Sequence, residues 1–173
     1  MNFANYFIKK KINSLLKEMS GRKPRFCSMS DAKNILVVFN IMDKNDVVLC
    51  IQKLREFDKN IHVCCFIPKK NKEYEPESTW ITILEEDFDS KGIPSDAACD
   101  KFARIPADIL IDFTRKNSYG MHYLLLNHPA NFKVGNKSSL RDMYDMTVAA
   151  TGNDDIQPLF DHILFYLLTI RSK

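Results

Sequence analysis

Continuous runs of apolar residues alternate in this chain with stretches in which apolar residues recur every three or four positions. Continuous runs are typical of strands covered on both faces, and the wider spacing is typical of helices packed on one face. The runs predict strands over residues 34–41, 61–67, 80–84, 107–113, 130–134 and 144–149. The wider spacing predicts helices over residues 4–19, 44–58, 96–104, 119–127 and 156–171.

This alternation predicts an α/β protein, a three-layer sandwich around a mostly parallel sheet of about five or six strands of the Rossmann or flavodoxin type. Residues 34–67 have the length of a right-handed strand–helix–strand crossover. By analogy with doubly wound folds we expect the strand order 3-2-1-4-5. We expect Gly135 to end the strand that begins at Ala130.

Charge is distributed unevenly along the 173 residues. Residues 1–33 hold eight basic and two acidic side chains, whereas the rest of the chain holds 17 basic and 20 acidic ones. We therefore expect an extra basic N-terminal helix with its connection over residues 1–33, and a single α/β domain over residues 34–173.

Three interpretations of the basic helix follow from its pattern. It packs an apolar stripe that includes Ile8 and Ile12 on the domain and leaves its lysines in water, which we favour. Alternatively, residues 1–19 lie on an anionic membrane surface with Phe3 and Phe7 inserted. The third interpretation, contact with nucleic acid, is the least favoured because the rest of the chain is acidic.

The motifs of common cofactor and metal sites are missing from the sequence. Neither a G-x-G-x-x-G nor a P-loop pattern follows the first predicted strand, and the four histidines lack metal-site spacing. The five cysteines form no C-x-x-C pair, and the chain starts without a secretory pattern, so we expect reduced thiols and a cytoplasmic location. No cofactor and no metal is assigned, and whether the protein is an enzyme stays open.

Ligands of open α/β sheets bind beyond the carboxyl ends of the strands. Polar and small residues follow the predicted strands and form the candidate ligand-binding set: Asn40, Asp43, Lys69, Thr114, Arg115, Lys116, Gly135, Asn136, Lys137 and Thr151. If these residues meet at one edge, their cations, hydroxyls and loop amides suit a phosphate-bearing anion. The alternative interpretation, which is the commoner case, is that they are solvated loop residues.

Asp112 is the candidate catalytic residue. It shares one face of its predicted strand with Asp108 and Leu110, and it lies near the carboxyl end. A carboxylate in that place suits a general base, a metal ligand or a ribose contact. The alternative is a structural role, in which Asp112 caps the following loop or pairs with Arg115 or Lys116.

Several short motifs carry a resemblance to a known family. They are the D-x-x-x-D strand Asp108–Asp112, the FKVG turn Phe132–Gly135 and the triplet that starts at Tyr144, together with the basic leader. With these motifs the chain resembles a small bacterial family described only as a domain of unknown function. The resemblance implies a bacterial cytoplasmic protein and supplies no catalytic residues.

These observations leave three hypotheses for function. The first is a non-catalytic module that binds a small phosphate-bearing anion or a protein partner. The second is an enzyme for a phosphorylated or nucleotide-bearing substrate, with Asp112 as acid, base or metal ligand and Arg115, Lys116 and Lys137 as anion clamp. The third is a peripheral membrane or scaffold protein that uses residues 1–19. We also expect a homodimer through the last helix, which is apolar on most sides.

Overall fold

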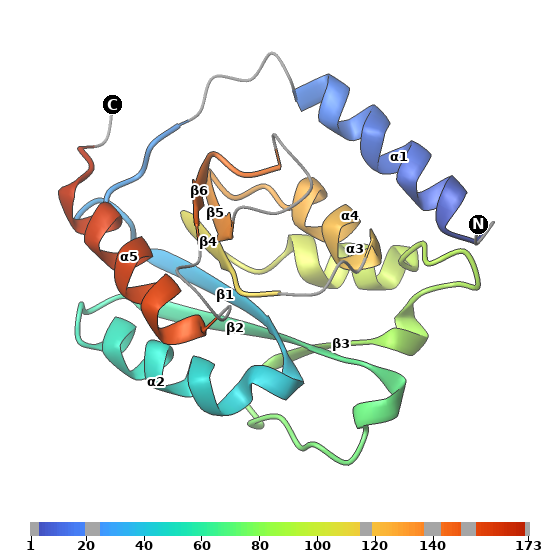
Figure 1. Ribbon diagram of the computed structural model, residues 1–173, viewed down its shortest axis with the longest axis horizontal. Coiled ribbons are helices and arrows are strands. Elements are labelled where there is room, and N and C mark those ends of the chain that lie inside the picture. Colours follow the sequence, from blue (N-terminus) through green and yellow to red (C-terminus); the bar gives the residue numbers. More distant parts are fainter. Residues whose placement is uncertain (1–3, 20–24, 115–118, 137–142, 150–154, 172–173) are drawn as a thin grey trace.

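The computed structural model describes residues 4–19, 25–114, 119–136, 143–149 and 155–171 (Figure 1). The strands are β1 (Asn34–Asn40), β2 (Asn60–Ile67), β3 (Ile81–Leu84), β4 (Ile109–Asp112), β5 (Phe132–Asn136) and β6 (Met146–Val148). The α-helices are α1 (Ala4–Met19), α2 (Lys44–Arg55), α3 (Asp96–Ala103), α4 (Tyr119–Asn127) and α5 (Ile156–Thr169). Three 3₁₀ turns complete the elements: η1 (Ile41–Asp43), η2 (Lys69–Asn71) and η3 (Glu85–Asp87).

The six strands form one sheet in the order β3-β2-β1-β4-β5-β6, and every neighbouring pair is parallel. The predicted α/β class and the expected order of the first five strands are therefore confirmed, and β6 extends the sheet beside β5. The direction of strand addition reverses between β1 and β4. In doubly wound folds this switch point opens a crevice at the carboxyl ends of the two strands.

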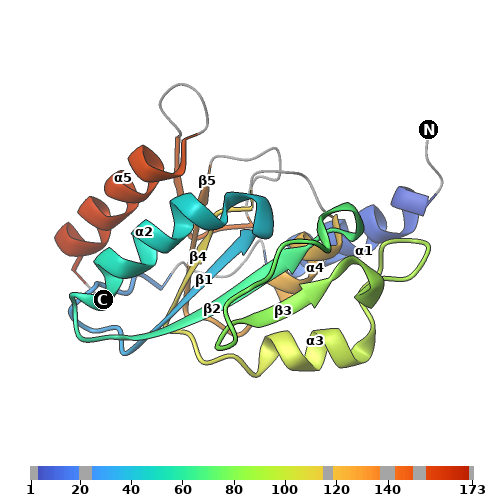
Figure 2. The same ribbon diagram turned by 90° about the horizontal axis from the view of Figure 1, so that it is seen from below.

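Helices cover both faces of the sheet, with α2 and α5 on one side and α1, α3 and α4 on the other (Figures 1 and 2). On the α2/α5 side the core includes Phe39, Ile111 and Phe160, and on the other side it includes Leu36 and Leu110. The continuous apolar runs of β1, β2 and β4 follow from this arrangement, because both faces of each strand are buried.

Helix α1 packs its apolar stripe into the core on the α3/α4 side. Ile8 and Ile12 are 0% and 1% exposed, and Leu15, Leu16 and Met19 are partly buried against the same cluster. The packing part of the favoured interpretation is therefore confirmed. Lys9, Lys10, Lys11 and Lys17 lie on the outer side and are exposed.

One strand boundary corrects the sequence analysis. Strand β5 runs from Phe132 to Asn136, so Gly135 lies inside the strand and does not end it after Val134. The reason is a tertiary contact, because a Cβ on Gly135 would lie 2.5 Å from Cζ of Tyr144. Gly135 allows an aromatic ring to pack closely on the strand. From the sequence alone, the other common role of glycine, that of ending a strand, is expected.

The connection from β2 to β3 contains only η2 and loop, where doubly wound folds usually have a helix. The ammonium group of Lys44, at the start of α2, holds this loop by donating to the carbonyl oxygen of Glu75 at 2.8 Å. The same group lies 5.6 Å from the ring centroid of Trp80. Within the described ranges, no helix has the length and apolar character needed to cross a membrane.

Candidate functional site

The sheet brings several of the predicted site residues to one edge. Asn40, Asp112 and Asn136 are the last residues of β1, β4 and β5, and Asp112 is paired in register with Val38 and Gly135. Thr114 follows β4 directly, and Lys69 follows β2 at the same edge. Four residues of the predicted set lie outside the described residues: Arg115, Lys116, Lys137 and Thr151.

Two of these edge residues make local hydrogen bonds that shape the loops. The side-chain oxygen of Asn40 accepts a hydrogen bond from the backbone N–H of Met42 at 3.1 Å and so starts η1. The backbone N–H of Lys69 donates to the Glu85 carboxylate at 2.7 Å, while the Lys69 side chain is exposed. Asp43 is half-buried at the start of α2.

Asp112 forms a buried hydrogen-bonded group with its neighbours. It is only 2% exposed. Its Oδ1 accepts from the backbone N–H of Thr114 at 2.8 Å and from the Thr114 hydroxyl at 2.6 Å. Its Oδ2 accepts from the Tyr144 hydroxyl. Asp112 therefore caps the loop after β4, which is one of the two structural roles considered from the sequence.

Tyr144 reaches Asp112 across the neighbouring strand. Its ring lies against Gly135 of β5, where any larger residue would collide with it. The following residue, Asp145, exchanges two hydrogen bonds with the backbone of Lys133: the Lys133 N–H donates to the carboxylate at 2.8 Å, and the Asp145 N–H donates to the Lys133 carbonyl at 2.9 Å. The segment before β6 is thus attached to both β4 and β5.

Burial changes the acidity of this group. Loss of solvent raises the pKa of Asp112 to about 6, although the hydrogen bonds from Thr114 and Tyr144 act in the opposite direction. Burial and the nearby Asp112 charge raise the pKa of Tyr144 well above its usual range. Asp112 can therefore change protonation state near neutral pH while Tyr144 remains a neutral donor.

The described residues hold no group of three or more His, Cys, Asp or Glu side chains arranged as metal ligands. Lys133, next to Asp145, is 1% exposed and donates to the carbonyl oxygen of Leu126 at 2.9 Å. A cation in that place offsets the partial negative charge at the carboxyl end of α4. Its buried ammonium group thereby stabilises this end of α4.

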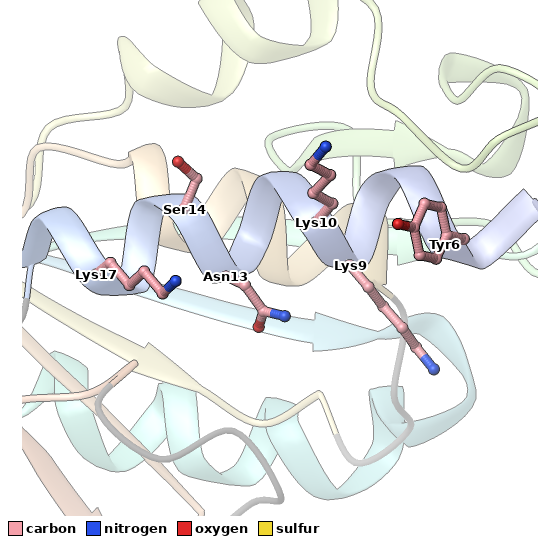
Figure 3. A pocket seen from close by; sticks show the side chains of 6 residues that line it. All are labelled: Tyr6, Lys9, Lys10, Asn13, Ser14 and Lys17. Atoms are coloured by element: carbon pink, nitrogen blue, oxygen red, sulfur yellow. The ribbon is translucent and has the colours of Figure 1, made fainter.

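A groove of about 510 Å³ runs along the outer side of α1 (Figure 3). The described side chains that line it are Tyr6, Lys9, Lys10, Asn13, Ser14 and Lys17. Lys9 and Asn13 leave the helix on one side, and Lys10 and Ser14 leave it on the other. From Tyr6 to Lys17 the lining extends over about 16 Å of helix. Among the described lining residues there are three cations and no carboxylate.

Contacts of Lys9, which lines the groove, and of Phe7, which is next to Tyr6 on α1, show where the amino-terminal half of the groove lies. The ammonium group of Lys9 is 4.8 Å from the ring centroid of Tyr119, the first residue of α4. Lys91, in the loop that follows η3, lies 5.0 Å from the ring centroid of Phe7. Both contacts are made with segments that leave the carboxyl ends of strands. The groove therefore begins beside the edge that carries Asp112 and Thr114.

The groove residues are not among the site residues predicted from the sequence. The signal was present, because at about 100° per residue all six fall within an arc of about 140°, opposite Ile8 and Ile12. Three cations in one such arc also describe an ordinary solvated face. The groove of about 510 Å³ beside these side chains distinguishes them from such a face.

No curated protein matches the chain. A solved structure, an exopolyphosphatase-related protein from Bacteroides fragilis, is similar with a TM-score of 0.49 and 11% sequence identity. The similarity covers 91% of this chain but only 43% of that protein, so the chain spans less than half of its length. A family model matches residues 5–170. The chain thus belongs to a family of unknown function, DUF6913.

Proposed function

We propose that this protein is an α/β module that binds a small phosphate-bearing anion in the groove along α1. The observation that carries the proposal is the described lining of that groove, which has three lysines and no carboxylate around about 510 Å³. Small-molecule sites in proteins typically have volumes of roughly 300–1,000 Å³. The groove therefore has room for a small ligand and charge of the sign that suits an anion.

The chemistry of the lining also favours an oxyanion. Lysine, tyrosine, serine and asparagine side chains all carry hydrogen-bond donors, so all six described residues can donate. Phosphate oxygens accept such bonds, and those from ammonium groups are charge-assisted and strong. An apolar ligand would instead bury these donors without partners, which is unfavourable.

The position of the groove agrees with the binding rule for this fold class. Its amino-terminal half begins at Tyr119, close to the carboxyl edge of the sheet, where doubly wound folds bind ligands. Arg115, Lys116, Lys137 and Thr151 follow strands in the sequence, and they stay part of the proposal as further ligands of the anion. Asn40, Thr114 and Gly135 shape the edge in this proposal.

Titration calorimetry with pyrophosphate tests the proposal. We expect binding that weakens as NaCl is raised, because solvent-exposed charges are screened by salt. The triple variant Lys9→Gln, Lys10→Gln, Lys17→Gln should lose at least about tenfold in affinity, about 1.4 kcal/mol. The proposal is wrong if the triple variant binds pyrophosphate as tightly as the unchanged protein.

Two control variants separate the groove from general charge. Lys53→Gln, Arg55→Gln, Lys59→Gln removes the same number of cations from the α2 side of the molecule and should leave affinity unchanged. Lys69→Gln, Lys70→Gln removes cations that follow β2 at the carboxyl edge. A larger loss from the second variant than from the groove variant would move the site to that edge.

Native mass spectrometry of the purified protein is the first experiment to make. A retained mass that matches a phosphate compound would identify the ligand, and it should disappear in the groove variant.

An enzyme for a phosphorylated substrate is the second candidate function. Its support is the pKa of Asp112, which burial raises to about 6 at the ligand-binding edge, because strongly shifted carboxyls cluster at functional sites. Asp112 is 2% exposed and both of its oxygens accept hydrogen bonds. We therefore expect Asp112→Asn to keep pyrophosphate affinity, and hydrolysis of pyrophosphate that Asp112→Asn abolishes would favour the enzyme instead.

A further inference from the structure

Two exposed aromatic rings stand at the amino-terminal end of α1. Tyr6 and Phe7 are 60% and 49% exposed, and their rings meet edge to face with centroids 5.7 Å apart. Tyr6 also lines the lysine groove. Large aromatic side chains that stay in water beside a cationic groove represent apolar area that a partner can bury.

The core holds these rings in their outward position. Ile8 and Ile12, on the opposite side of α1, are at most 1% exposed. The helix therefore cannot rotate its apolar stripe outward without losing that packing. An isolated amphipathic helix would insert the stripe into a bilayer. In this protein only the outer side of α1, with its lysines and the two rings, is available to a surface.

Basic side chains near the two rings suit an anionic surface. Lys91 lies 5.0 Å from the ring centroid of Phe7, and Lys9 and Lys10 follow one turn along the groove. The described part of α1 has one acidic side chain, Glu18, which lies beyond the described lining of the groove. A phenyl ring flanked by ammonium groups matches the boundary of a bilayer, where the ring lies among acyl chains and the cations meet phosphates.

We infer that the outer side of α1 docks on an anionic lipid bilayer, with lipid phosphates in the lysine groove and Tyr6 and Phe7 in the interfacial layer. The inference rests on the proposed function, since the groove is the same and the lipid headgroup is the source of the phosphate. A free phosphate compound would account for the lysines of the groove, but it would leave the exposed ring of Phe7 in water. A nucleic acid is disfavoured because residues 34–173 have three more acidic than basic groups.

Vesicle co-sedimentation of the full chain tests the inference. Vesicles of phosphatidylcholine with about a quarter phosphatidylglycerol should bind at least tenfold more protein than vesicles of phosphatidylcholine alone, and NaCl at high concentration should reverse the binding. Phe7→Ala should lower partition into the anionic vesicles at least fivefold. Because Phe7 does not line the groove, this variant should keep its affinity for pyrophosphate.

The matched control lies on the other side of the molecule. Phe165 of α5 is 62% exposed and forms an edge-to-face pair with Tyr166 at the same centroid distance of 5.7 Å. Phe165→Ala removes a phenyl ring that is at least as exposed as Phe7 and does not touch α1, so it should leave vesicle binding unchanged. An equal loss from Phe165→Ala and Phe7→Ala would contradict docking through α1.

The outcomes separate this inference from the proposed function. Pyrophosphate binding without preference for anionic vesicles would overturn bilayer docking and leave a soluble phosphate ligand. If the groove variant loses both pyrophosphate binding and vesicle binding, the result supports the proposed function and bilayer docking. Absence of both in the unchanged protein contradicts both. Displacement from vesicles by a 20-nucleotide single strand at micromolar concentration would overturn the bilayer in favour of nucleic acid.

Discussion

The two faces of the sheet differ in what they bury. On the α2/α5 side the core cluster consists of aliphatic, aromatic and thiol-bearing side chains, with Phe39, Phe113 and Phe160 among the largest. The buried acidic and basic side chains of the described residues are Asp112, His122, His128 and Lys133, and all belong to the α1/α3/α4 side. Because buried ionisable groups cost stability unless they are partnered, these groups depend on local hydrogen bonds, as Asp112 does on Tyr144 and Lys133 on the carbonyl oxygen of Leu126.

The outer surfaces differ as well. Helix α1 presents lysines, whereas α5 presents Phe165, Tyr166 and Leu168, which are 62%, 46% and 53% exposed. One side of the molecule thus offers charge to a partner and the other offers apolar area. The comparison predicts that the two sides respond differently to core truncation, pH and surface substitution.

The largest expected effect is loss of apolar packing on the α5 side. Phe160 is fully buried and packs against Phe113 with ring centroids 6.3 Å apart. Phe160→Ala should reduce the free energy of unfolding by about 3–5 kcal/mol. Phe165→Ala, on the exposed side of the same helix, should change it by less than about 0.5 kcal/mol. Urea unfolding of both variants measures the difference, and equal losses would show that α5 packs differently.

The next largest effect is a pH dependence that arises on the α1 side. Burial raises the pKa of Asp112 to about 6 in the folded protein from 3.8, so the folded state binds more protons than the unfolded state between these values. Stability from this group is fully present below pH 3.8 and is lost as pH rises through 6. The shift corresponds to about 3 kcal/mol.

The variant Asp112→Asn isolates this contribution. Burial lowers the pKa of His122 and of His128 to about 4. The stability that these two histidines contribute to the protein is therefore lost as pH falls from 6.5, whereas the contribution of Asp112 is lost as pH rises. Both histidines are present in both proteins and cancel in the comparison. The stability of Asp112→Asn relative to the unchanged protein should therefore rise by about 3 kcal/mol between pH 3.5 and pH 7. A constant difference in urea unfolding would contradict a buried, titrating Asp112.

Removal of the Tyr144 hydroxyl should have a smaller effect. Tyr144→Phe leaves Oδ2 of a 2%-exposed Asp112 without its tyrosine donor, which should cost about 1–3 kcal/mol at pH 7. The pKa of Asp112 should rise further, because a hydrogen bond that favours the carboxylate is lost. Tyr166→Phe is the matched control on α5 and should be neutral. Thermal unfolding of the two variants at several pH values measures both effects.

Gly135→Ala should act on the same contact from the strand. The new Cβ would lie 2.5 Å from Cζ of Tyr144, so the ring has to move away from Asp112. Overpacking of this kind costs about 1–3 kcal/mol. If the ring moves as expected, the losses from Gly135→Ala and Tyr144→Phe should not add in the double variant. Full additivity would show that the two residues act independently.

The smallest expected effect concerns self-association through α5. An exposed apolar face can pair with a second copy of itself about a twofold axis, so we expect a homodimer at high protein concentration. Leu168→Lys should raise the dimer dissociation constant at least tenfold, about 1.4 kcal/mol. Phe7→Lys, the same kind of change on α1, should have no effect. Sedimentation velocity measures both, and a monomer at millimolar concentration would contradict the dimer.

Most of the fold could be predicted because its signals are local. The apolar run at Ile35 marks β1, and the spacing of Val47, Ile51 and Leu54 marks α2. The parallel sheet and its switch point followed from the order of these elements. Of the candidate site, the sequence predicted that Asp112, Thr114 and Asn136 reach one edge, since parallel strands end on the same side.

The site itself depends on contacts between residues distant in the sequence. Asp112 could be read as a base, a metal ligand or a loop cap until Tyr144 and Thr114 were found to occupy its two oxygens. Gly135 was taken for the end of a strand because the ring it accommodates lies nine residues further on. Hydrophobic periodicity describes which side of an element is buried, but it does not describe which polar groups meet.

The sequence by itself determined the α/β class, the elements and the basic character of α1, because backbone pairing and apolar burial repeat with periods that are visible in one segment. Only the tertiary structure decided that the apolar stripe of α1 is buried in the core and that the lysines of its outer side line a groove. It also decided that Asp112 is buried and accepts a hydrogen bond from Tyr144. These features arise where separate segments meet, and their energies come from desolvation and close packing of partners that no single segment specifies.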